Sequence, residues 1–167
     1  MSAFIELTKE MRIGQMKNRE KIISDLMEDI KGKDILEVAC GTAEISLVAS
    51  DYANQIKCID LVDFRLGNID RKNISFEIMD ASKMTYADNT FDTIIIYNAF
   101  AHIVTQWHYI EKECRRVLKN TGKIILISTW SLDLEPMKEQ FKEKVKSMNG
   151  YWKVEIDKKG ELFHCSA

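Results

Sequence analysis

Short apolar runs alternate with amphipathic segments along most of this chain. Five of the runs are dominated by Ile, Val, Leu and Phe, which is typical of strands buried on both faces of a parallel sheet. They lie at residues 34–38, 55–59, 74–79, 91–97 and 123–128. Two further runs, at 152–156 and 161–166, flank the polar sequence Asp157-Lys158-Lys159-Gly160 and predict a hairpin.

Segments with helical spacing of apolar residues separate these strands. The clearest stripe combines Ile22, Ile23, Leu26 and Ile30, and Gly32 supplies a C-terminal stop. Helices are expected at residues 3–16, 17–31, 44–52, 106–119 and 134–148, and a helix or turn at 64–70. Because strands and helices alternate, we predict a Rossmann-like, doubly wound α/β fold. Its sheet should have seven strands, mostly parallel with the last antiparallel, and helices on both faces.

Length and charge narrow the range of functions. The 167 residues fit one domain, with an N-terminal helical segment (1–31) as a candidate lid and a core at 32–167. A net charge of -2 argues against a large basic field for nucleic acid. The apolar runs are too short to span a bilayer, and no signal peptide is evident. We therefore expect a cytoplasmic monomer or homodimer that binds neither nucleic acid nor membrane.

The four cysteines give no sign of a metal site. Cys40, Cys58, Cys114 and Cys165 contain no CxxC pair, and His164-Cys165 alone does not make a cluster of ligands. We predict no bound metal, and we interpret the cysteines as free thiols in a reducing compartment.

A cluster of small residues follows the first predicted strand. Ala39, Gly41 and Ala43 lie between that strand and the predicted helix beginning at Glu44. Small side chains let a backbone approach a ligand closely, and a helix N-terminus offers free N–H groups. In doubly wound sheets ligands bind at the carboxyl ends of the strands. This loop is therefore the expected centre of a ligand site.

Three acidic residues, Glu37, Asp60 and Asp80, lie at the ends of three successive predicted strands. Asp60 follows Ala43 by 17 residues, close to the spacing of the acid that binds ribose in dinucleotide folds. Asp80 could accept a hydrogen bond from an exocyclic amine of a base, and Glu37 could hold an ammonium group or fix the loop. Because carboxylates repel a pyrophosphate, the set favours a positively charged nucleoside without phosphate.

Taken in order along the chain, the small-residue loop and the segments that end in Asp60 and Asp80 resemble those of class I S-adenosylmethionine-dependent methyltransferases. The resemblance covers nearly the whole chain after about residue 20. Residues 35–43 resemble the first motif of that family, and Cys58-Ile59-Asp60 resembles the second. The segment 76–81 resembles the part with the adenine-contacting acid. The segments 91–95 and 113–123 resemble the fourth strand and the helix–turn–strand signature after it.

The resemblance implies S-adenosylmethionine as the methyl donor and S-adenosylhomocysteine as the product. It places eight residues at the donor site: Glu37, Ala39, Gly41, Asp60, Leu61, Asp80, Ala81 and Tyr97. By this resemblance, Asp60 would bind the ribose and Leu61 would lie against the adenine. Asp80 and the Ala81 amide would contact the adenine edge, and the loop around Gly41 would hold the methionine end.

For the acceptor, the residues indicate a class but not a compound. Methyl transfer from a sulfonium needs mainly positioning, and a general base only if the acceptor carries a proton. His102, Tyr97 and His108 are the candidate bases, and the resemblance places Asn98 near the transferred methyl. No Asn-Pro-Pro-Tyr-like motif follows the fourth strand, which disfavours amino methylation of nucleobases or glutamine. We expect a small-molecule acceptor. Phe4, Met11 and Met16 are candidates to cover it.

Two alternatives remain open. Ala39 and Ala43 stand where the family usually has glycine, and a methyl at position 43 would crowd the donor if that site needs a positive φ. A non-catalytic S-adenosylmethionine-binding or partner-subunit protein of the same fold is therefore one alternative. The other is an NAD-dependent oxidoreductase, which would need Gly-x-Gly-x-x-Gly where this chain has Ala39-Cys40-Gly41-Thr42-Ala43-Glu44.

Overall fold

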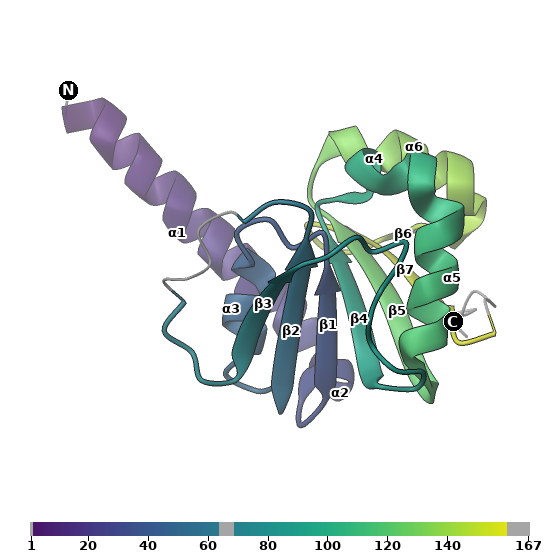
Figure 1. Cartoon of the computed structure of the whole chain (residues 1–167). Helices are drawn as coiled ribbons and strands as arrows, with labels where there is room; N and C mark the ends of the chain where they lie inside the picture. Colours follow the sequence, from purple (N-terminus) through teal and green to yellow (C-terminus); the bar gives the residue numbers. More distant parts are fainter. Residues whose placement is uncertain (1, 64–68, 160–167) are drawn as a thin grey trace.

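A single mixed sheet organises the computed structural model, which describes residues 2–63 and 69–159 (Figure 1). Seven strands make up the sheet in the order β3-β2-β1-β4-β5-β7-β6. They are β1 (Asp34–Val38), β2 (Gln55–Asp60), β3 (Ile74–Ile78), β4 (Phe91–Tyr97), β5 (Leu118–Ser128), β6 (Lys146–Ser147) and β7 (Trp152–Asp157). Neighbours among β1 to β5 pair in parallel, and β7 is antiparallel to β5 and β6. The predicted seven-stranded, doubly wound fold is confirmed.

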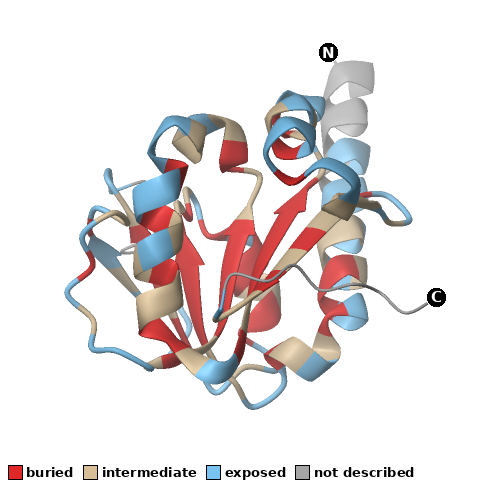
Figure 2. Ribbon diagram, turned by 90° about the vertical axis from the view of Figure 1, so that its right-hand side faces the viewer, coloured by how far each residue is buried: buried red, intermediate tan, exposed pale blue. Residues whose placement is uncertain are grey.

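Helices cover both faces of the sheet. One face carries α1 (Ser2–Asp25), α2 (Met27–Ile30) and α3 (Glu44–Ala49), and the other carries α4 (Phe100–Ile103), α5 (Trp107–Val117) and α6 (Ser131–Phe141). Successive strand residues alternate between these faces, so Ile94 packs with α4 to α6 and Ile95 with α1 to α3. Figure 2 shows the buried residues gathered in the sheet and on the helix sides that face it.

The N-terminal helices differ from their prediction. Gly14 does not interrupt α1, which continues from Ser2 to Asp25. Leu26 separates α1 from α2. Ile22 and Ile23 are fully buried against the sheet, whereas Met11 and Met16 are exposed. The side chain of Phe4 lies outside the described residues.

The prediction of one helix over residues 134–148 is wrong in its second half. α6 ends at Phe141, where Lys142 takes a positive φ of 54°, and a 3-10 turn (Lys142–Lys144) leads into β6. Met148 N then donates to Tyr151 O at 2.7 Å and closes a tight connection to β7. The observed hairpin is therefore β6–β7. The strand expected at 161–166 lies outside the described residues, as does most of the turn expected at 64–70.

The helix expected at 106–119 also ends early. A 3-10 turn (Val104–Gln106) precedes α5, which stops at Val117, and β5 begins at Leu118 rather than at residue 123. Gly122 lies within the strand, where an added Cβ would come within 2.6 Å of Asp92 O. The turn expected within the helix–turn–strand segment 113–123 is thus the irregular start of β5. The pairing of β5 with β4 shifts register there, between Phe91 and Thr93.

Candidate active site

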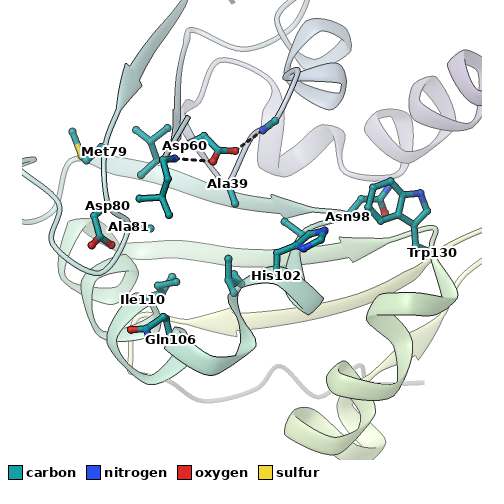
Figure 3. A pocket seen from close by; sticks show the side chains of 15 residues that line it. Ala39, Asp60, Met79, Asp80, Ala81, Asn98, His102, Gln106, Ile110 and Trp130 are labelled. Atoms are coloured by element: carbon teal, nitrogen blue, oxygen red, sulfur yellow. Dashed lines mark hydrogen bonds between the residues drawn. The ribbon is translucent and has the colours of Figure 1, made fainter. Parts of the chain in front are cut away.

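A cavity of about 500 Å³ opens at the carboxyl ends of the central strands. It lies where the strand order reverses, since β1 pairs with both β2 and β4. Its walls come from the segments that follow β1, β2, β3, β4 and β5 and from the α4–α5 region (Figure 3). This volume falls within the range of small-molecule sites, and the position is the one that doubly wound sheets use for ligands.

The loop after β1 is folded by a run of left-handed residues. Ala39, Gly41 and Ala43 have φ angles of 53°, 53° and 55°. Ala43 N donates to Cys40 O at 2.8 Å and closes the turn. A Cβ built on Gly41 would meet nothing within 4 Å, so the cavity side of the loop has space.

Ala43 keeps its methyl away from the cavity. Its side chain is fully buried in the core cluster shared with α3, and it is not one of the cavity residues, whereas Ala39 and Gly41 are. Ala43 has the positive φ, 55°, for which its methyl group was expected to crowd the methyl donor. The methyl group lies in the core instead, so it leaves the cavity free.

Asp60 ties the loop to the end of β2. Its Oδ2 accepts from Gly41 N at 2.8 Å and its Oδ1 from Leu61 N at 2.7 Å, as Figure 3 shows. Leu61 is 68% exposed and forms part of the cavity rim. A carboxylate oxygen can accept more than one hydrogen bond. Asp60 can therefore hold the loop and still present acceptors to a ligand.

Asp80 brings a second carboxylate to the same cavity. Ser82 N and Ser82 Oγ donate to its Oδ1 at 2.9 Å and 2.7 Å, and these bonds hold the pKa of Asp80 below its usual value. Ala81 follows it in the cavity wall, and none of the described lining residues is a lysine or an arginine. This end of the cavity is acidic, which suits a cationic nucleoside and disfavours a phosphate.

Glu37 and Tyr97 are the two predicted donor-site residues that do not line the cavity. Glu37 is 1% exposed and points to the α1–α3 face, where it accepts hydrogen bonds from Ser46 Oγ and, at 3.9 Å, from Cys58 Sγ. Burial raises its pKa well above the usual range. Tyr97 packs on the same face, and burial raises its pKa too.

Asn98 and His102 lie in the cavity wall after β4. Asn98, with a φ of 51°, accepts from Thr129 N at 2.8 Å and donates to Thr129 Oγ1 at 2.9 Å, so its amide joins the ends of β4 and β5. His102 is exposed on α4, and its backbone N–H donates to Ala99 O at 3.0 Å. The roles predicted for these two residues stay predictions, but both lie at the cavity.

Several cavity residues were not foreseen from the sequence. They are Met79, Ile103, Gln106, Ile110 and Trp130, together with Ile59 and Ala99. Trp130 follows β5 by two residues, so the strand-end rule that selected Asp60 and Asp80 could have selected it as well. The residues of α5 carried no comparable signal, because their apolar stripe reads only as core.

Two other classes of feature are missing from residues 2–63 and 69–159. These ranges hold no group of three or more His, Cys, Asp or Glu residues placed to bind a metal ion. No helix within them is both long and apolar enough to cross a membrane.

Comparison with known proteins identifies relatives of this fold. A family model described as a methyltransferase domain matches residues 36–126. The chain is 24% identical over 166 residues to a demethylmenaquinone methyltransferase of Thermotoga maritima, covering 94% of this chain and 67% of that protein. It is 28% identical over 118 residues to the demethylmenaquinone methyltransferase of Paenarthrobacter aurescens, covering 70% of this chain and 46% of the relative. The chain thus spans about half to two thirds of these relatives.

A solved structure shows the same fold at lower identity. A SAM-dependent methyltransferase from Aquifex aeolicus superposes with a TM-score of 0.62 at 16% identity. The superposition covers 82% of this chain and 87% of that one.

Proposed function

The chain belongs to the methyltransferase-domain family, and from that premise we propose that it transfers a methyl group from S-adenosylmethionine to a small-molecule acceptor. The observation that carries the proposal is the acidic end of the cavity. Two carboxylates at the ends of neighbouring strands, Asp60 and Asp80, open on the same space as the Gly41 loop. S-adenosylmethionine supplies a methyl group already activated on a positively charged sulfur.

The residues of the acidic end fit this donor. Asp60 would accept from the ribose hydroxyls, each charge-assisted bond contributing roughly 1.5–3 kcal/mol. Asp80 and Ala81 would contact the adenine edge, and Leu61 would cover its face. The open space beside Gly41 would take the methionine end. Because Ala43 packs into the core, the alanine substitutions do not argue for a site that has lost its ligand.

A small-molecule acceptor is supported by two observations. The relatives that match most of this chain are named for methylation of demethylmenaquinone. The cavity, at about 500 Å³, has the size of a small-molecule site, and its described lining lacks the lysines and arginines that would bind a nucleic-acid backbone.

Thermal unfolding with added ligands tests the donor assignment. A ligand at 100 times its dissociation constant stabilises the fold by roughly 2.7 kcal/mol. We expect S-adenosylmethionine and S-adenosylhomocysteine to raise the melting temperature and NAD to leave it unchanged. Asp60→Ala should abolish the shift with S-adenosylhomocysteine, whereas Asp51→Ala, at an exposed acid outside the cavity, should keep it.

Each outcome bears on a different part of the proposal. A shift with NAD alone, or with none of the three compounds, would overturn the donor assignment. An undiminished shift in Asp60→Ala would show that the ribose contact is misassigned. Loss of the shift in Asp51→Ala as well would mean that the variants act through general destabilisation.

A further inference from the structure

A second cavity, of about 450 Å³, opens at the edge of the sheet opposite to the first. Its walls come from the loop before β4, the C-terminal half of α5, the start of β5 and the residue after β7. Because α5 runs from α4 to the start of β5, one helix reaches both cavities (Figure 1). Four of the seven described lining residues of the second cavity are cationic, namely Lys112, Arg115, Arg116 and Lys158.

The guanidinium of Arg115 is held in place and keeps its charge. Its Nε donates to Lys158 O at 2.9 Å, and its Nη2 donates to Lys159 O at 2.8 Å. Both acceptors are uncharged carbonyl groups, and no carboxylate in residues 2–63 and 69–159 forms an ion pair with Arg115. A guanidinium has five N–H donors, so three remain for a ligand. Such a fixed fork matches the oxygens of a phosphate group.

Lys158 adds a second fixed positive charge. Its Nζ donates to three backbone carbonyls at the C-terminal end of α5, those of Arg115 at 2.8 Å, Arg116 at 3.3 Å and Leu118. A cation is favourable at a helix C-terminus, so the ammonium group stays in this position. Among the described residues, Lys158 also has no carboxylate in an ion pair with it.

Arg116 belongs to the wall of the cavity and offers no free donor. Its five N–H groups donate to the carboxylates of Glu113 and Asp88 and to two backbone carbonyls. Asp88 is the acidic residue of the described lining, and its ion pair with Arg116, at 2.8 Å, occupies its charge. The remaining cations therefore give the cavity a positive charge.

Three exposed side chains add further donors. Lys112 lies three residues before Arg115, so both lie on the same side of α5 and line the cavity. Asn89 and Asn120 contribute side-chain amides from the loop before β4 and the start of β5. The backbone N of Asn89 donates to Arg116 O at 3.1 Å, which fixes that loop against α5.

We propose that this second cavity binds a compact oxyanion with more than one negative charge, the phosphate or pyrophosphate group of a small molecule. The proposal is independent of methyl transfer. Lys112, Arg115 and Lys158 attract a multiply charged anion more strongly than a carboxylate, and the guanidinium and amide groups supply donors for several oxygens. Duplex nucleic acid carries one charge per about 1.7 Å and needs an extended row of cations. Here the cations are confined to one cavity of a protein with a net charge of -2.

Calorimetric titration of the full chain with pyrophosphate tests the site. We expect one pyrophosphate to bind per chain, inorganic phosphate to bind more weakly, acetate not to bind, and the affinity to fall as the salt concentration rises. Lys112→Gln should weaken pyrophosphate binding about tenfold, through the loss of one charge-assisted bond. Lys138→Gln removes an exposed lysine of α6 outside both cavities and should leave the affinity unchanged.

Two variants of Arg115 test the fixed fork. Arg115→Gln should weaken pyrophosphate binding about tenfold or more, and Arg115→Lys, which keeps the charge but loses the fork, should weaken it less. Thermal unfolding without ligand shows whether each variant is folded. Lys112→Gln keeps the test valid where the Arg115 variants lose stability, because no hydrogen bond of the Lys112 side chain holds the described structure together.

Titration in the presence of saturating S-adenosylhomocysteine locates the bound anion. Pyrophosphate should bind equally well with and without this compound, because Asp60 and Asp80 make the first cavity acidic. Displacement of pyrophosphate by S-adenosylhomocysteine would place the anion in the first cavity and overturn the proposal.

Three further outcomes would overturn it. One is the absence of pyrophosphate binding at low salt. Another is equal weakening by Lys112→Gln and Lys138→Gln, which would show only a general attraction between charges. The third is tighter binding of an RNA oligonucleotide without terminal phosphates than of pyrophosphate, which would make this surface a nucleic-acid site instead.

Discussion

Glu37 buries a carboxyl group beside Ser46 and Cys58, and burial raises its pKa well above the usual range. A carboxyl whose pKa is raised on folding stabilises the fold fully below its unfolded pKa of about 4.3. That contribution is lost as the pH rises toward the folded value. Glu37→Gln keeps an acceptor for Ser46 and cannot ionise. We expect the variant to gain stability over the wild type as the pH rises, by about 1.4 kcal/mol for each unit of pKa shift.

Urea unfolding of the two proteins between about pH 4 and pH 8 measures this difference. Glu28→Gln, at an exposed glutamate on the neighbouring α2, is the matched control and should show no pH-dependent gain. A variant that is less stable than the wild type by the same amount at every pH would contradict the prediction. It would mean that folding does not raise the pKa of Glu37.

At the scale of elements, Asp133 joins α6 to both α4 and β5. Its two oxygens accept from Ala101 N and Ser128 Oγ, and α4 has no side-chain cap of its own at Ala99. Asp133→Ala would remove the acceptor of Ala101 N and leave Ser128 Oγ with only its longer contacts, to Asn98 Oδ1 at 3.3 Å and Trp130 O at 3.2 Å. A donor left unsatisfied costs about 1–3 kcal/mol. We expect the variant to lose about 2–4 kcal/mol of unfolding free energy in chemical denaturation.

Two substitutions separate this role from a general effect of α6. Asp133→Asn keeps one acceptor oxygen and should lose less stability than Asp133→Ala. Glu135→Ala removes an exposed acid two residues later on the same helix and should change stability by no more than about 0.5 kcal/mol. Equal losses for Asp133→Ala and Glu135→Ala would show that the buried hydrogen bonds do not join the elements as described.

Helices and strands were predictable from the sequence where the pattern of apolar residues fits only one type of secondary structure. The apolar runs of β1 to β4 fixed those strands to within a residue because few other structures bury such runs. Val145 and Met148 fit a helical stripe equally well, and nothing in the sequence marks the positive φ of Lys142 that ends α6. The sequence pattern therefore favoured a longer helix where the chain forms β6.

The site was predictable to the same extent. The strand-end acids indicate the edge of the sheet at which the cavity opens, and Asp60 and Asp80 line that cavity. In a strand that is apolar on both faces, however, the sequence does not show which residues face α1 to α3 and which face α4 to α6. Glu37 therefore could not be assigned to the α1–α3 face from the sequence. Trp130, two residues after β5, was within reach of the same strand-end rule.

At the scale of the whole molecule, α1 has two halves with different environments. Its C-terminal half is anchored, since Ile22 and Ile23 are fully buried and Arg19 pairs with Glu44 of α3 at 2.8 Å. Its N-terminal half projects away from the sheet (Figure 1), and the side chains of residues 10, 11 and 13–17 are exposed. A helical stretch with exposed side chains contributes little stability in water. The predicted lid role of residues 1–31 is thus a question about the projecting half alone.

We expect removal of residues 1–16 to change the free energy of unfolding by no more than about 0.5 kcal/mol. The affinity for S-adenosylhomocysteine, measured by calorimetry, should also stay the same, because the anchored half keeps its contacts with the sheet and α3. Ile23→Ala is the contrasting change, since it opens a cavity in the core and should cost about 2–5 kcal/mol. A truncated protein of unchanged stability that binds S-adenosylhomocysteine at least tenfold more weakly would contradict this expectation, and the projecting half of α1 would then act as the lid.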